Sequence, residues 1–410
     1  MARVHALRAC DGLATSVAAY VTPVVVYQVT GSTAWAGIVF VAEWLPRLLA
    51  IGVGGPLVDQ VPARTVMLVA ALARGGLVTC GMAAYAAGAG PLAIAAVGVG
   101  CGVAAEITYL AAESLGATVA TGPRAAGVQA AQTAIDQGAI LTGPLLGGAL
   151  LLLGPQYGLG LIAMLSLTAA ALTRTVAARP HPASREPQPA AETDSRGLRG
   201  GAAALKALPA LAWLLATLAS MNLMAALLQA ATPVIVTNFG HSPAATGAVW
   251  TASAAAALLA AAACARLLKR VRLSSLAITA SVGGALATAA AGLAPSYLAY
   301  AAALAGLAAC EGIAMVALRT ARARLLPPRV FGSAVALMVL VLIAPMPLGG
   351  AVLALVPADR LGTALITVAV LHAAVTACAA RRLRRHRQVL DHPQPAQPPA
   401  PEPELVRSPK

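Results

Sequence analysis

Charged side chains are scarce in this sequence of 410 residues, at 10% of the total, whereas about 25% is usual for a soluble domain. Aromatic residues reach only 3%, which argues against a binding site built as a large aromatic cage. The six cysteines stand singly, without a Cys-x-x-Cys pair, and predict neither a disulfide framework nor a metal site. The motifs of phosphate-binding loops, zinc proteases and serine hydrolases are missing as well. The sequence therefore favours a protein that is not an enzyme and needs no resident cofactor.

Hydrophobic residues, in contrast, make up 59% of the chain. A membrane span needs about 20 consecutive, mainly apolar residues, and in lipid only a helix pairs all the backbone groups of such a run. We therefore predict an all-α integral membrane protein with twelve transmembrane helices. The predicted spans are residues 9–30, 34–57, 65–86, 91–115, 125–152, 156–177, 208–238, 244–267, 274–294, 296–319, 330–355 and 361–380.

The basic residues alternate between the ends of these spans. With the amino-terminus inside, nearly all arginines and lysines fall in cytoplasmic turns or termini, as the positive-inside rule requires. Arg3 and Arg8 precede the first span without a small-residue cleavage site, so we expect this span to be its own insertion signal. Both termini are predicted to be cytoplasmic. The net charge of +14 then reflects topology and contact with lipid headgroups, and nucleic acid is not an expected partner.

The chain is divided near its middle and repeats itself. A proline-rich, polar stretch separates the sixth and seventh spans. Thr22-Pro23-Val24 recurs as Thr232-Pro233-Val234, and small residues follow both copies at matching offsets. We predict two six-helix halves related by pseudo-symmetry. The expected domains are residues 1–178, a cytoplasmic linker at 179–205, residues 206–387, and a disordered proline-rich tail at 388–410.

Two short motifs support a more specific interpretation. Gly55, Asp59 and Arg64 lie between the second and third spans, in a segment that the Gly-Pro pair marks as a tight loop. The spacing resembles the signature loop of major facilitator superfamily transporters, from which Gln60, Pro62 and Ala63 depart. The resemblance implies a cytoplasmic gate latch that involves Asp59 and Arg64, with Arg124 as a candidate partner.

The fifth span carries Gly143-Pro144-Leu145-Leu146-Gly147-Gly148. This string resembles the fifth-helix motif of drug–proton antiporters in the same superfamily. Glycine allows helix backbones to approach closely, and proline kinks a helix by removing a backbone hydrogen bond. Gly143, Pro144, Gly147 and Gly148 are therefore expected to form a kink at a moving interface; generic helix packing is the alternative. The fourth span lacks the arginine that such antiporters often have, and carries Glu106 instead.

Ionisable residues inside membrane spans are functional candidates by default. Glu106, Glu311 and Asp136 are candidate proton carriers, because a buried carboxyl that is exposed to each side in turn can load and release a proton. Glu43 and Arg47, four residues apart on one helical face, can pair directly, and a purely structural role for this pair is equally open. The candidate cavity residues are Glu43, Arg47, Gln132 and Gln229.

The resemblance extends over about residues 8–385 and implies an exporter of the multidrug and siderophore branch in a bacterial inner membrane. We expect export of a small amphiphilic organic molecule by alternating access in exchange for protons, by a protein that is a monomer. An importer or symporter on the same fold is the first alternative. A membrane sensor or assembly partner that transports nothing is the second.

Overall fold

The computed structural model describes residues 2–119, 125–176, 197–242, 245–267, 270–326 and 331–385, and all the regular elements in these ranges are helices. Twelve spans there are long and apolar enough to cross a membrane, as the sequence predicts. The helices of the first half are α1 (Ala2–Thr30), α2 (Thr33–Gln60), α3 (Ala63–Ala86), α4 (Pro91–Val119), α5 (Ala125–Leu151) and α6 (Pro155–Thr175). Those of the second are α7 (Gly197–Ala207), α8 (Pro209–Asn238), α9 (Ala245–Leu267), α10 (Leu273–Gly292), α11 (Tyr297–Leu325), α12 (Phe331–Ile343), α13 (Met346–Leu355) and α14 (Leu361–Arg385), with a short 3₁₀ turn at Ala358–Arg360.

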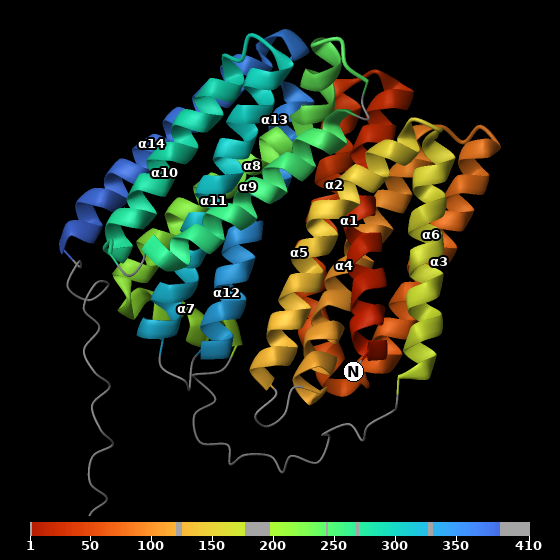
Figure 1. Cartoon of the computed structure of the whole chain (residues 1–410), viewed down its shortest axis with the longest axis horizontal. Coiled ribbons are helices and arrows are strands. Elements are labelled where there is room, and N and C mark those ends of the chain that lie inside the picture. The colour runs from red at the N-terminus through yellow and green to blue at the C-terminus, as the bar shows by residue number, and fades with distance from the viewer. Residues whose placement is uncertain are drawn as a thin grey trace, which may run out of the picture.

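The helices form two bundles that stand side by side, one from α1 to α6 and the other from α7 to α14 (Figure 1). The second bundle has one continuous hydrophobic core. The first has two separate clusters, one around Val21 and Val97 and the other around Leu7 and Met67. Buried charged residues of α1 and α3 lie in sequence between the members of these clusters. The two halves are therefore similar in outline but are stabilised differently.

Two helix ends differ from the sequence prediction. The expected tight loop near Gly55 is wrong, because α2 continues as a helix to Gln60. It stops just before Val61 and Pro62, since a residue that precedes proline is disfavoured in the helical region. The eleventh span is not one helix: α12 ends at Ile343 and α13 starts at Met346. Pro345 and Pro347 stand close together here, and two missing N–H donors interrupt the helix where single prolines elsewhere do not.

A short helix, α7, precedes the second half and packs against α12. It begins within the segment for which the sequence indicated a polar linker. The rest of that segment up to residue 196 lies outside the described residues, as do the predicted tail at 388–410 and Arg124. The domain boundaries therefore stay predictions.

Candidate functional site

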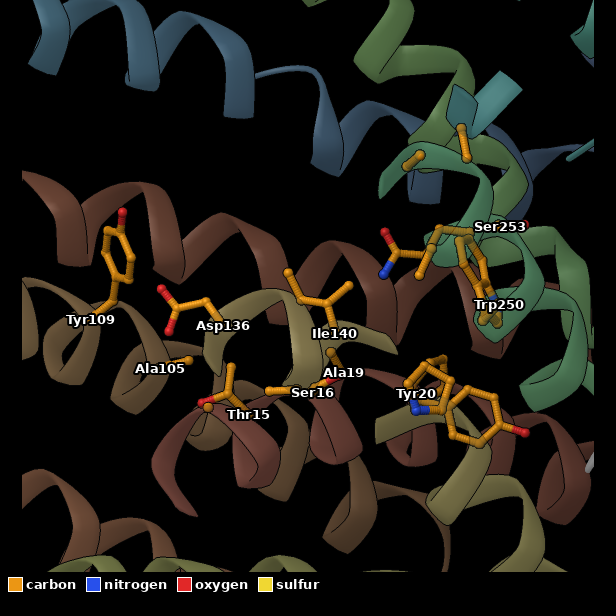
Figure 2. Close-up of a pocket in the computed structure, with 18 of the residues that line it drawn as sticks. Thr15, Ser16, Ala19, Tyr20, Ala105, Tyr109, Asp136, Ile140, Trp250 and Ser253 are labelled. Carbon is orange, nitrogen blue, oxygen red and sulfur yellow. The ribbon is translucent and has the colours of Figure 1, made fainter. Parts of the chain in front are cut away.

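A cavity of about 580 Å³ lies between the two halves. Pockets for small organic ligands usually measure about 300–1,000 Å³, so the space suits a small organic molecule. Its walls come from α1, α2, α4 and α5 on one side and from α8, α9 and α11 on the other. In Figure 2, Asp136 and Tyr109 lie toward one end of the cavity, and Trp250 and Tyr20 toward the other.

The halves touch each other mainly through α2 with α13 and through α5 with α9. At the first crossing, Gly37 packs against the backbone of Gly350 and Ala354. At the second, Gly247 packs against the backbone of Pro144 and Gly148. Both crossings lie at the end of the bundle opposite to the N-terminus, because they are near the start of α2 and of α9. The cavity therefore lies on the N-terminal side of a closed end.

The motif predicted on α5 forms part of this closed end. The helix is continuous through Pro144, which lines the cavity. Gly143 packs against Ser16 and Gly147 against Tyr20, both on α1. The opposite edge of the motif meets α9 of the other half through Pro144 and Gly148. Small residues here allow α5 to contact a helix of each half at close range.

Asp136, which has no basic neighbour in its own helix, forms an ion pair with Arg8 of α1. Arg8 donates from Nε to Oδ1 over 2.8 Å and from Nη2 to Oδ2 over 2.6 Å. Such a two-pronged guanidinium–carboxylate contact is among the stronger polar interactions in proteins. Both residues line the cavity. The sequence could not reveal this pair because 128 residues separate its members.

A second ion pair ties together α1, α3 and α6. Arg74 donates to Oδ1 of Asp11 over 2.6 Å, to Ser166 over 2.9 Å and to Thr15 over 2.9 Å. The side chain of Arg74 has no exposed surface, and that of Asp11 is 10% exposed. A charge this deep in a membrane protein is tolerated only with such partners. The pair therefore fixes the centre of the first half, and sequence reasoning had not identified Asp11 as the partner.

The pair that the sequence spacing predicted also forms. Arg47 donates from Nη2 to Oε1 of Glu43 over 2.7 Å, and its guanidinium lies 4.4 Å from the centre of the Trp44 ring. Gly102 of α4 leaves room for the Arg47 Nε, which has no hydrogen-bond partner in the described part of the chain. Glu106 follows Gly102 by one helical turn and interacts electrostatically with Arg47. Arg47 lines the cavity, whereas Glu43 and Glu106 stand behind it.

Glu311 is the candidate that the structure sets apart. It lines the cavity from α11, and no ion pair or hydrogen bond of its carboxyl is found within the described residues. Its neighbour Gly312 packs against the carbonyl of Ala257 on α9, which places Glu311 at the level of Ala257. Gln229 of α8 lines the same cavity.

The remaining predicted site residues have other positions. Gln132 is buried on α5 outside the cavity lining, and neither polar atom of its amide has a hydrogen-bond partner in the described structure. Arg64 donates to the carbonyls of Thr173 and Arg174 at the end of α6, where a cation suits the unpaired carbonyls of a helix terminus. The structure does not describe the surroundings of Gly55, the side chain of Asp59 or Arg124, so the gate latch stays a prediction.

Asn222 and His372 link helices of the second half to one another. Asn222 of α8 donates to the carbonyl of Leu342 over 2.7 Å, close to the break between α12 and α13. His372 of α14 is within 2.8 Å of the Ser220 hydroxyl and 3.0 Å of the Ser281 carbonyl, and so joins α14 to α8 and α10. Within the described residues, no three His, Cys, Asp or Glu side chains gather as they would around a metal ion.

Solved structures of known transporters share this architecture. A bacterial homologue of the iron transporter ferroportin in an inward-facing state superposes with a TM-score of 0.72 at 17% sequence identity, over 92% of this chain and 98% of that one. A bacterial homologue of the human lysosomal transporter Spinster, inward-facing and unoccupied, gives 0.70 at 15% identity over 93% and 96%. A D-xylose–proton symporter gives 0.70 at 12% identity over 95% and 97%. Identities this low show the fold alone.

No curated protein sequence matches the chain significantly. The sequence profile of the Major Facilitator Superfamily, however, matches residues 5–350, which is most of the chain. The fold, the twelve spans and the cavity between two halves agree with that match. The chain therefore belongs to the Major Facilitator Superfamily of membrane transporters.

Proposed function

We propose that this transporter exports a small amphiphilic organic molecule in exchange for protons, by alternating access of the cavity between its halves. One observation carries the proposal: Glu311 places a carboxyl without an ion-pair partner among the described residues in the wall of that cavity. When the two halves rock, this carboxyl faces each side of the membrane in turn. It can then take up a proton from one side and release it to the other.

Of the three proton-carrier candidates, the geometry favours Glu311. Protonation of Asp136 would break its two-pronged contact with Arg8, whose Nη2 lies 2.6 Å from Oδ2 of Asp136. Glu106 interacts electrostatically with Arg47, which already pairs with Glu43, and Glu106 does not line the cavity. Glu311 has no ion-pair partner within the described residues, so protonation of its carboxyl breaks no ion pair there.

The direction of transport follows from the predicted topology. With both termini in the cytoplasm of a bacterial inner membrane, the closed crossings of α2 with α13 and of α5 with α9 lie at the outer surface. The cavity is then accessible from the cytoplasm, where an exporter binds its substrate. The Gly-Pro-x-x-Gly-Gly string of α5, at one of these crossings, supports the same direction through its resemblance to antiporters.

The experiment uses proteoliposomes with an imposed pH gradient and a panel of amphiphilic compounds of different charge. We compare the unmodified protein with Glu311→Gln, Glu106→Gln and Asp136→Asn. Asp359 is exposed and does not line the cavity, so Asp359→Asn is the matched control for the loss of one carboxylate. We expect substrate-dependent proton flux that Glu311→Gln abolishes and Asp359→Asn leaves unchanged.

Two results would refute the proposal. Substrate movement that ignores the pH gradient in all variants would leave facilitated diffusion or a different coupling ion. Substrate accumulation in the same direction as the proton would instead establish a symporter. Full proton coupling in Glu311→Gln, combined with its loss in Glu106→Gln, would move the carrier to the Arg47 cluster.

A further inference from the structure

We infer that the substrate of this cavity is an organic cation, and that it competes with a proton for Glu311. The inference rests on the proposed function, since it concerns the same cavity and the same carboxyl. Three independent features carry it: the charge balance of the lining, the backbone carbonyls that three prolines release, and the position of a tryptophan relative to Glu311.

The charge balance of the cavity is negative by one unit. The lining has two arginines, Arg8 and Arg47, and three carboxylates, Asp11, Asp136 and Glu311. Among the described residues, Arg8 pairs with Asp136, Arg47 with Glu43 and Arg74 with Asp11. Glu106 stands behind the wall and interacts with Arg47, so Glu311 is the lining carboxylate left without an ion-pair partner. An uncompensated charge in a low-dielectric site is costly. A cationic ligand or a proton on Glu311 would remove this cost, whereas an anionic ligand would increase it.

Three prolines inside helices line the cavity: Pro23 of α1, Pro144 of α5 and Pro233 of α8. Proline has no N–H, so the carbonyl four residues earlier loses its usual helical donor, and the proline ring lies beside that carbonyl. The residues four positions earlier all line the cavity as well, namely Ala19, Ile140 and Gln229. The cavity wall is thus supplied with three carbonyls released from helical pairing. The three helices stay continuous through these prolines, and a backbone carbonyl that lacks its helical donor is a group that can face a cation.

Trp250 provides the apolar side of the site. On α9, Trp250, Ser253, Ala254 and Ala257 recur at helical spacing and all line the cavity. Glu311 is level with Ala257, about 10 Å along the helix axis from Trp250 at 1.5 Å per residue. A molecule with a positive charge near Glu311 and a hydrophobic body against the indole fits this arrangement. Trp44, in contrast, already has the Arg47 guanidinium on its face.

No cationic residue among the described neighbours compensates the charge of Glu311, so a ligand or a proton has to do so. Neither α8 nor α10 contains a charged residue, and α9 has only Arg266, in its last turn. Cys310 is the adjacent titratable group on α11, and the charged groups across the cavity are Arg8, Asp136 and Arg47, each already paired. Because an uncompensated charge in such a site is costly, we expect the Glu311 carboxyl to carry a proton in the empty cavity. When a monovalent cation binds, that proton leaves to water, so the net charge of the site stays constant.

The test measures equilibrium binding to the purified, detergent-solubilised protein. The probes are tetraphenylphosphonium and tetraphenylborate, which have nearly the same shape and opposite charge. Titration calorimetry in two buffers with different ionisation enthalpies also counts the protons released. The variants are Glu311→Gln, Glu311→Asp and Trp250→Ala, with Asp359→Asn as the control for loss of a carboxylate far from the cavity.

We expect tetraphenylphosphonium to bind the unmodified protein with release of one proton. Glu311→Gln should weaken this binding at least tenfold and abolish the proton release, but should not weaken tetraphenylborate binding. Glu311→Asp should retain the preference for the cation, which shows that a loss in Glu311→Gln is not misfolding. Trp250→Ala should weaken binding of the cation about threefold to tenfold, which corresponds to the loss of about 1 kcal/mol of apolar contact with the indole. Asp359→Asn should bind both probes as the unmodified protein does.

Equal affinity of Glu311→Gln and the unmodified protein for tetraphenylphosphonium would overturn the inference, and so would tighter binding of tetraphenylborate. The two proposals can fail separately. Cation binding at Glu311 without antiport in vesicles would refute the proposed function alone. Proton-coupled export of neutral compounds, with no preference for the cation, would refute only the inference that the substrate is a cation.

Discussion

The helices at the closed end of the bundle approach closely at glycines, and Gly350→Ala tests whether the contact of α2 with α13 tolerates one added methyl group. A Cβ at position 350 would lie 2.8 Å from the carbonyl oxygen of Gly37, 2.9 Å from Cδ1 of Phe40 and 3.0 Å from the backbone nitrogen of Val41. All three atoms belong to α2 of the other half, and two are backbone atoms that cannot rotate away. Overpacking of this kind costs about 1–3 kcal/mol. The cost falls on the state in which α2 and α13 touch.

The ratio of the closed to the open form of this end should therefore fall by a factor of about 5 to 150, at about 1.4 kcal/mol per factor of ten. Spin labels at Ala89 and Ala358 report the change, because both are exposed at the end of the bundle opposite to the N-terminus, one in each half. They would be placed in a variant whose six native cysteines are replaced. Pulsed electron resonance should then show a longer-distance population that is weak or missing in the parent.

Gly76→Ala is the matched control, because a Cβ there has nothing within 4 Å. It makes the same chemical change in a transmembrane helix without touching the other half. An unchanged distance distribution in Gly350→Ala would refute the reasoning, since it would mean that α13 moves aside within its own half. The packing of the neighbouring Gly349 against Ala226 of α8 argues against such a shift.

Two further predictions concern the polar centre of each half. Arg74→Ala should destabilise the protein by about 3–5 kcal/mol, because Asp11 is left buried without a partner; in thermal unfolding in detergent, adding Asp11→Asn should recover part of the loss, and a purely additive double variant would contradict the pair. His372→Leu should cost about 1–3 kcal/mol, because the Ser281 carbonyl and the Ser220 hydroxyl lose a buried partner; the same unfolding assay would contradict this by showing no change.

The sequence allowed prediction of what depends on local spacing. The apolar runs predicted the spans, and the i,i+4 spacing predicted the contact of Glu43 with Arg47. The repeat of Thr22-Pro23 as Thr232-Pro233 indicated equivalent helices, and both prolines do line the cavity. Each of these features is a property of one helix or of two similar stretches. None needs knowledge of which helices pack together.

What the sequence could not show depends on packing between distant segments. Arg8 meets Asp136 and Asp11 meets Arg74 only after α1 is placed against α5 and α3. Before that, Asp136 was an acid without a basic neighbour in its own helix and was one of three candidate proton carriers. The same reasoning from sequence placed Glu106 and Glu311 on equal terms, since both are acids in the inner part of equivalent helices. Only the cavity separates them, because Glu311 lines it and Glu106 does not.

The two halves thus line the cavity with different chemistry. Ion pairs join α1 to α3 and to α5 in the first half, so the charges that these helices place at the cavity are paired within that half. The second half has an apolar core and contributes one carboxyl to the cavity. Between them, the crossings at Gly37 and Gly247 are contacts of small residues and backbone, which separate without breaking an ion pair. On the proposed mechanism, rocking would leave the paired charges of the first half intact, and the occupancy of Glu311 by a proton or a cation would be what differs between the two orientations.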